Sequence, residues 1–259
     1  MKISIVTAVF NAAGTIQETI DAVAAQTYPQ REHIVIDGGS RDGTVEIIER
    51  NRDKLAYFVS EPDRGVYDAM NKGLERASGD VVACLNADDV YVSPRVLARV
   101  AEVMVDRDVA GCYANLYFVR QHDPAQIVRR MRSQPYCQGL FERGWMPPHP
   151  TLFIRRDLLT QVGGFDLAFR LQSDFDLAIR LFRLAGERIR YVDETWVRMR
   201  MGGLSNRSWR HVLRGNLEAY AACRKNGLNV WPWFPVQKVL SRIPEFLRKS
   251  GAGGGSALP

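Results

Sequence analysis

The first hundred residues alternate between short β-branched apolar runs and segments with helical periodicity. The runs at Ile3–Val9, His33–Asp37, Tyr57–Ser60 and Val81–Leu85 predict four strands, and the segments between them predict helices. Parallel strands need crossover connections of this length, whereas antiparallel strands can be joined by tight turns. The alternation therefore predicts an α/β fold with a Rossmann-like, mostly parallel sheet and flanking helices.

The second half of the chain is less regular. Apolar runs at Thr151–Ile154 and Ile189–Val192 predict strands, and helical periodicity covers Asp174–Ala185 and a segment from about Trp209 to Lys225. The polar stretch Asp123–Pro135 predicts a loop.

These patterns divide the chain into four parts. Its 259 residues suit one long domain or two closely joined halves, which we place at 1–120 and 121–228. A basic amphipathic segment follows at 229–249, and the Gly-rich stretch 250–259 predicts a flexible tail.

The cysteines and the apolar runs indicate in which cellular compartment the protein is expected. Four scattered cysteines form no CxxC pair, and a chain of this size does not need disulfides, so we expect reduced thiols. No apolar run approaches the roughly 18 residues of a spanning helix, and the N-terminus does not resemble a signal peptide. We expect a cytoplasmic protein.

Acidic residues follow two of the predicted strands. Asp37 ends the second strand, and Asp88 and Asp89 follow the fourth. Ligands of open parallel sheets bind outside the carboxyl ends of the strands, so these acids should face one cleft. Asp37 could instead cap the next helix, and one acid of the adjacent pair could also be a cap.

Adjacent carboxylates repel each other, which favours a cation between Asp88 and Asp89. Oxygen ligands without a nearby His or Cys suit Mg²⁺ or Mn²⁺, whose coordination is completed by phosphate oxygens. The sequence contains neither a GxGxxG fingerprint nor a GxxxxGK[ST] loop, which argues against a dehydrogenase and a P-loop enzyme.

Several motifs together make the chain resemble the family 2 glycosyltransferases of GT-A fold. They are the end of the first strand at Thr7–Asn11, the turn Asp37–Ser40 and the variant DxD motif Asn86–Asp89. The stretches Glu61–Gly73 and Gly202–Asn206 are similar to signatures of the bacterial polysaccharide branch, including lipid-linked glycan synthesis. The resemblance covers about 200 residues and implies merged donor-binding and acceptor-binding halves.

The resemblance also implies roles on the donor side. Asp88 would bind the metal, with Asp89 as the second candidate, and Asp37 would accept from a base N–H. A strict DxD motif has Asp where this chain has Asn86, which leaves the metal fewer carboxylates. The donor-binding residues implied are Thr7, Val9, Asn11, Asp37, Gly65, Asp68, Asn71, Lys72, Asn86 and Ala87.

On the acceptor side, the family's catalytic base matches Asp174 in Ser173-Asp174-Phe175-Asp176, although Ser173 replaces the usual Glu. The alternative is an acid stabilised by the helix N-terminus. The residues implied to line the acceptor or the diphosphate are Trp145, His149, Gly203 and Ser205.

The C-terminal quarter carries the positive charge. Between Arg198 and Lys249 the basic residues outnumber the acidic ones by nine, and from Trp231 on apolar residues recur at helical spacing between Lys and Arg. This pattern is typical of a segment lying on an anionic membrane surface, and equally of a helix docked on the domain.

The resemblance therefore implies an inverting glycosyltransferase that moves a sugar from a nucleotide-sugar donor, UDP-sugar favoured, to a hydroxyl of a glycan or lipid-linked acceptor. A nucleotide-sugar-binding protein without turnover is the main alternative. The basic segment lacks a helix-turn-helix or zinc pattern, and the acids of the cleft would repel phosphate, so no nucleic-acid partner is expected.

Overall fold

The computed structural model describes residues 1–201, 209–231 and 233–234. Its first half is the predicted parallel arrangement, in which neighbouring strands are hydrogen-bonded in the order β3-β2-β1-β4. The strands of this half are β1 (Ile3–Val9), β2 (Arg31–Asp37), β3 (Tyr57–Ser60) and β4 (Val81–Cys84). The connecting helices are α1 (Ile16–Ala24), α2 (Thr44–Arg50) and α3 (Val66–Arg76).

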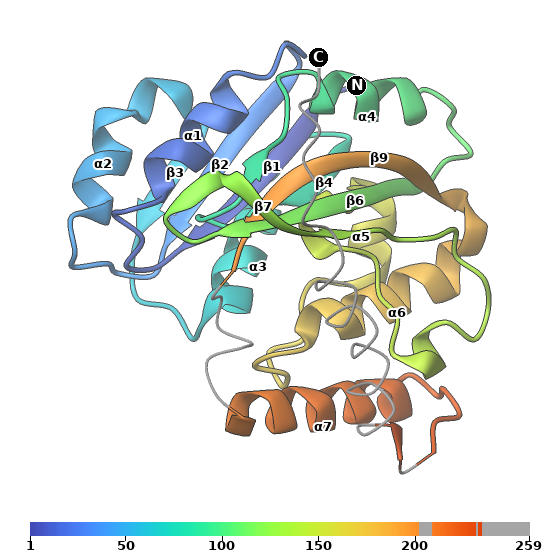
Figure 1. The fold of residues 1–259 in the computed structure, drawn as a ribbon. Coiled ribbons are helices and arrows are strands. Elements are labelled where there is room, and N and C mark those ends of the chain that lie inside the picture. The colour runs from blue at the N-terminus through green and yellow to red at the C-terminus, as the bar shows by residue number, and fades with distance from the viewer. Residues whose placement is uncertain (202–208, 232, 235–259) are drawn as a thin grey trace, which may run out of the picture.

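The second half extends the same sheet. Beyond β4 the order continues β8-β6-β9-β5, and β7 pairs with β6 (Figure 1). These strands are β5 (Val90–Tyr91), β6 (Gly111–Arg120), β7 (Asp123–Met131), β8 (Phe153–Arg155) and β9 (Ile189–Arg200). Because β8 is antiparallel to both β4 and β6, and β9 is parallel to β6, the carboxyl ends of β1–β4, β6 and β9 lie at one edge.

Helices cover both faces of this sheet. The remaining helices are α4 (Val96–Val103), α5 (Arg156–Val162), α6 (Ser173–Ala185) and α7 (Trp209–Lys225), with single 3₁₀ turns η1 (Arg52–Lys54), η2 (Phe141–Arg143), η3 (His149–Thr151) and η4 (Gly186–Arg188). One face packs against α3, α5, α6 and α7, and the other packs against α1, α2 and α4. Among the described residues, no helix is long and apolar enough to cross a membrane.

Close packing of α3 on β1 depends on one glycine. A Cβ atom at Gly73 would collide with Val6 of β1, so a side chain at this position would push the helix away from the sheet. The start of α3 is thereby held at the carboxyl edge, directly after β3.

The prediction of a loop at Asp123–Pro135 was wrong, because β7 occupies most of it. Within the described part of the chain this strand pairs only with β6, and all its side chains are exposed or half-buried. A strand without a buried face does not need apolar residues at alternate positions. The sequence of β7 therefore lacks the periodic apolar pattern from which a strand is predicted. The strand predicted at Ile189–Val192 likewise continues to Arg200 along β6.

Candidate active site

The Asp37 carboxylate closes the turn after β2. It is fully buried and accepts hydrogen bonds from the backbone N–H groups of Gly39 at 3.0 Å and Ser40 at 2.9 Å, and from the Ser60 hydroxyl at 2.6 Å. The Ser40 hydroxyl also donates to it. Asp37 therefore closes this turn and fixes the loop at the carboxyl edge of the sheet. The alternative that Asp37 caps the next helix was wrong, because α2 begins at Thr44 with Gly43 as its N-cap.

The residues at the end of β1 lie next to this edge of the sheet. Thr7 is buried, with its Oγ1 atom 2.9 Å from Nε2 of His33, and Val9 is 3% exposed in the core. Asn11 has a positive φ of 49° and is exposed. Its side-chain oxygen accepts from the Arg41 N–H at 3.0 Å, so it joins the two loops that follow β1 and β2.

Predicted donor residues of α3 differ in what they contact. Asp68 is nearly buried and paired with Arg64, and Lys72 forms a surface ion pair with Glu61 at 2.6 Å. The Asn71 amide instead bonds to the backbone of Phe165, which donates to it at 2.7 Å and accepts from it at 2.8 Å.

Asn71 therefore connects α3 to the Gly163–Asp166 turn, and its amide does not point into solvent. Gly65 precedes α3 with a φ of 120°, a backbone conformation that only glycine adopts without strain.

The acidic pair lies at the end of β4. Asp89 is fully buried, and one carboxylate oxygen accepts from the Asn86 amide at 2.9 Å. The other oxygen, Oδ1, has no hydrogen-bond partner among the described residues. Burial, and then the charge of Asp88, raise the pKa of Asp89 well above its usual range. Burial also raises the pKa of the half-buried Asp88, against the charge of Arg200.

This donor set fits a hard divalent cation. The ligands available are carboxylate oxygens, and one of them is a buried atom without a hydrogen-bond partner among the described residues. Burial raises the pKa of both carboxyl groups, and a bound cation would favour their ionised forms. No group of three or more His, Cys, Asp or Glu side chains suited to a metal occurs among the described residues, so Asp88 and Asp89 would leave positions for other ligands. Ala87 is buried beneath them.

Asp174 begins α6 and joins a second polar cluster. Its Oδ1 atom accepts from the Tyr67 hydroxyl at 3.0 Å and from the Phe175 N–H at 2.9 Å. The Tyr67 and His149 rings both contact Phe165, with centroids 5.3 and 5.7 Å away. His149 is half-buried with a buried Nε2 atom, and burial lowers its pKa although the nearby Asp174 charge opposes the shift.

The two acidic clusters lie at the same edge of the sheet. The antiparallel register pairs Ala83 of β4 with Phe153 of β8, so η3 directly before β8 lies beside the end of β4. His149 of η3 is close enough to Asp174 to feel its charge. The 3₁₀ turn η3 therefore lies beside the end of β4, which precedes Asp88, and carries His149 near Asp174.

Trp145 lies in the aromatic packing behind this site. Its ring contacts Tyr113, Tyr136, Phe141 and Phe182, and its Nε1 atom is buried without a partner. Asp176 points into the core, where it bonds to Arg180 and Asn226. The predicted acceptor residues Gly203 and Ser205 lie outside the described residues.

Sequence reasoning missed two residues of the site. Tyr67 lies inside the quoted stretch Glu61–Gly73, and its position one residue before Asp68 gave no sign of a contact with α6. Arg200 is 4% exposed and donates to the Asp88 carbonyl at 2.8 Å and to Glu18 at 2.6 Å. A lone arginine at a strand end carries no recognisable signal.

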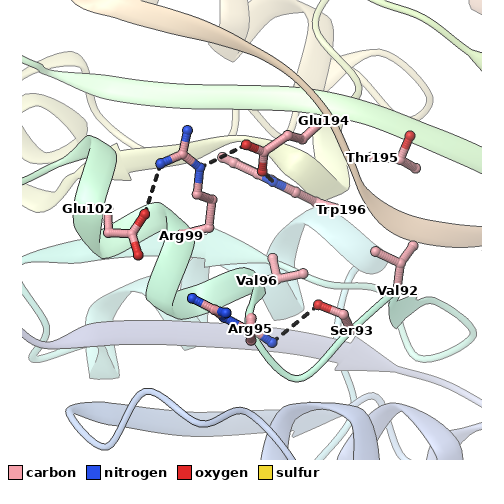
Figure 2. A pocket seen from close by; sticks show the side chains of 9 residues that line it. All are labelled: Val92, Ser93, Arg95, Val96, Arg99, Glu102, Glu194, Thr195 and Trp196. Carbon is pink, nitrogen blue, oxygen red and sulfur yellow. Dashed lines mark hydrogen bonds and ion pairs between the residues drawn. The ribbon is translucent and has the colours of Figure 1, made fainter.

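A hollow of about 210 Å³ lies elsewhere, between α4 and β9 (Figure 2). Arg99 in its wall bonds to Glu102 and Glu194, both at 2.8 Å, and Trp196 donates to Glu194. Its charged groups therefore largely satisfy one another, and it opens on the face opposite α6.

The chain is similar in sequence to known proteins. Residues 4–176 match the family model described as Glycosyl transferase family 2. An uncharacterized glycosyltransferase of Mycobacterium tuberculosis is 34% identical over 180 residues, covering 69% of this chain and 68% of that protein. A PGL/p-HBAD biosynthesis glycosyltransferase of Mycobacterium bovis is 31% identical over 218 residues, covering 78% of each chain.

Solved structures show the same fold at lower identity. S. aureus TarS 1–349 in complex with UDP-GlcNAc has a TM-score of 0.65 at 18% identity, covering 96% of this chain and 79% of that one. The mannosyltransferase PcManGT from Pyrobaculum calidifontis, in complex with GDP-Man and Mn²⁺, has a TM-score of 0.65 at 20% identity, covering 99% and 76%. The GT-A fold expected from the sequence is confirmed.

Proposed function

The chain belongs to the family 2 glycosyltransferases, and from this premise we propose that it is an inverting enzyme. It transfers a sugar from a nucleoside-diphosphate donor to a hydroxyl group of a glycan or lipid-linked acceptor in cell-surface polysaccharide synthesis. The proposal rests on the arrangement of Asp174, which accepts from Tyr67 of α3, and the acidic pair after β4 near the carboxyl edge of one sheet.

Asp174 is the proposed general base. Tyr67 and the Phe175 N–H both bond to Oδ1, and no partner for Oδ2 is found among the described residues. Oδ2 can therefore accept the proton of the acceptor hydroxyl while the other oxygen stays fixed. The hydroxyl oxygen then attacks the anomeric carbon, and the nucleoside diphosphate leaves from the opposite side.

Asp88 and Asp89 are the proposed holders of Mg²⁺ or Mn²⁺, which when bound stabilises charge on a departing diphosphate. The unpartnered Asp89 oxygen and the oxygen-only donor set support this assignment. PcManGT and a glucosyl-3-phosphoglycerate synthase were solved with Mn²⁺, which supports a divalent ion here as well.

A UDP-sugar is the favoured donor. TarS was solved with UDP and with UDP-GlcNAc, and the synthase with UDP, whereas PcManGT was solved with GDP-Man. Asp37 is proposed to accept from a base N–H of the donor, and the turn it closes holds its carboxylate at the carboxyl edge.

Association with an anionic membrane surface, on the cytoplasmic side, remains part of the proposal. Trp231 and Trp233 are 76% and 74% exposed, whereas Phe234 is buried against the domain. Most of 229–249 lies outside the described residues. Sedimentation with anionic but not with neutral vesicles at low salt would support it, and equal sedimentation with both would oppose it.

The test of the function measures UDP release from UDP-glucose, UDP-galactose and UDP-N-acetylglucosamine with Mn²⁺ and membrane lipid extract. Wild type should release UDP from at least one donor. Asp174→Asn should slow this release by about 10²-fold or more, because the base is lost, and should keep UDP binding.

Asp166→Asn is the control, because this neighbouring carboxylate forms a surface ion pair with Lys225. A wild-type protein that binds UDP but turns over no donor would favour the alternative of a binding protein. Near wild-type turnover by Asp174→Asn would remove this residue from the role of base.

A further inference from the structure

Three cross-strand neighbours form a cationic group on the β7-β6-β9 part of the sheet. Tyr117 of β6 is paired with Arg130 of β7 on one side and with Arg198 of β9 on the other. Residues in such a row have neighbouring side chains on one face of a sheet. Arg130 and Arg198 therefore lie on either side of Tyr117 on one face of the sheet, and we call these three residues the arginine row.

The arginine row faces the same side of the sheet as Asp174. Val197 and Met199, on either side of Arg198, pack in the core against α4, so Arg198 points to the opposite face. By the alternation along β6, Tyr117 lies on the same face of the sheet as Tyr113. The Tyr113 ring contacts Trp145 and also contacts Phe182, which belongs to α6.

The row also lies toward the carboxyl edge where the acidic pair is found. Arg198 pairs with Val90 of β5, which directly follows Asp89 in the chain. Two residues further along β9, Arg200 donates to the carbonyl of Asp88. An anion at the row would therefore lie next to the donor site.

The charge of the row is only partly compensated. Arg198 is half-buried, its Nε atom is buried without an acceptor, and it has no carboxylate partner among the residues that the structure describes. On the same face, Asp193 pairs with Arg132 and lies 3.8 Å from Arg130. Asp193 thus compensates Arg130 and Arg132 only, and a half-buried arginine such as Arg198 without a carboxylate partner favours an anionic ligand.

We propose that the arginine row binds a phosphate group carried by the acceptor, so that the substrate class is an anionic, phosphate-bearing glycan or lipid. This inference rests on the proposed function. The acceptor is favoured over the donor diphosphate because the row extends away from the acidic pair to Arg130 on the edge strand β7.

The test titrates methyl phosphate into the full chain, with and without saturating UDP and Mn²⁺, by isothermal calorimetry. Wild type should bind methyl phosphate in both states. Arg130→Gln and Arg198→Gln should weaken this binding about tenfold or more, because each removes a charged hydrogen bond, and should leave the UDP affinity within about twofold. Arg130 is about half exposed, so its variant tests the proposal even if Arg198→Gln folds poorly.

Arg190→Gln is the matched control, since Arg190 lies at the other end of β9 in a surface ion pair with Asp106. The proposal is overturned if wild type does not bind methyl phosphate, or if the control weakens binding as much as the row variants. Loss of UDP affinity in Arg198→Gln would assign this arginine to the donor diphosphate. Absence of UDP binding by wild type would instead contradict the proposed function, and the titration without UDP would still report on the row.

Discussion

The Tyr67 hydroxyl donates a 3.0 Å hydrogen bond to Oδ1 of Asp174 and thereby joins α3 to the first turn of α6. Burial, and then the charge of Asp174, raise the pKa of Tyr67 well above its usual value, so the phenol keeps its proton at physiological pH. Its ring stacks on Phe165, which Asn71 holds through two backbone hydrogen bonds. The orientation of the proposed base is therefore set from α3.

Tyr67→Phe should separate positioning from binding. The substitution keeps the ring and removes one hydrogen bond to a charged group, so kcat should fall about tenfold while the UDP affinity stays unchanged. Tyr57→Phe is the control, because the Tyr57 ring packs under Arg76 away from the site. Steady-state UDP release provides the measurement, and an unchanged kcat, or a loss confined to KM, would contradict a positioning role.

Asp88→Asn should weaken UDP binding about tenfold or more in the presence of Mn²⁺ and have little effect in EDTA. Asp88 is half-buried and is therefore the more accessible of the two proposed metal ligands. Asp80→Asn is the control, since Asp80 bonds to the Lys2 N–H before β4, at the opposite edge of the sheet. Thermal shift titrations with UDP provide the measurement, and equal losses with and without metal would contradict metal binding by Asp88.

The parallel half of the fold could be predicted because its strands are buried on both faces. β1 is buried at every position, and five of its seven residues are apolar. β7 is exposed or half-buried along its length, and its sequence has no long apolar run. It is a strand because it pairs with β6, and a local sequence pattern does not specify that pairing. Strand order and register across β8 also depend on contacts between distant segments.

Site residues could be predicted where an acidic side chain stands at the end or the start of a predicted strand or helix. Asp88, Asp89 and Asp174 follow or begin regular elements, and such positions project toward the edge of a sheet. Asn71 and Tyr67 are different, because their partners lie 94 and 107 residues away in the sequence. Only the packing of α3 against the Gly163–Asp166 turn decides what these side chains contact.

Asn71→Ala should lower the free energy of unfolding by about 2 kcal/mol, because it leaves the N–H and carbonyl of Phe165 without their partner. Lys72→Ala is the matched control on the same helix. It breaks a surface ion pair with Glu61 and should cost less than about 1 kcal/mol. Urea denaturation measures both, and equal losses for the two variants would show that Asn71 does not hold the turn.

His149 should make the protein less stable as the pH falls below neutrality. Burial lowers its pKa in the folded state, despite the charge of Asp174, so below about pH 6.5 the unfolded chain binds a proton that the folded chain does not. The free energy of unfolding should then fall by up to about 1.4 kcal/mol per pH unit from this residue alone.

His149→Gln removes this proton uptake, so its stability should depend less steeply on pH between 6.5 and 5.5 than that of wild type. His122→Gln is the control, since His122 is exposed and its variant should follow the wild-type slope. Urea denaturation at pH 7.5, 6.5 and 5.5 provides the measurement. Parallel curves for wild type and His149→Gln would mean that His149 takes up its proton equally in the folded and unfolded states, contrary to its burial beside Asp174.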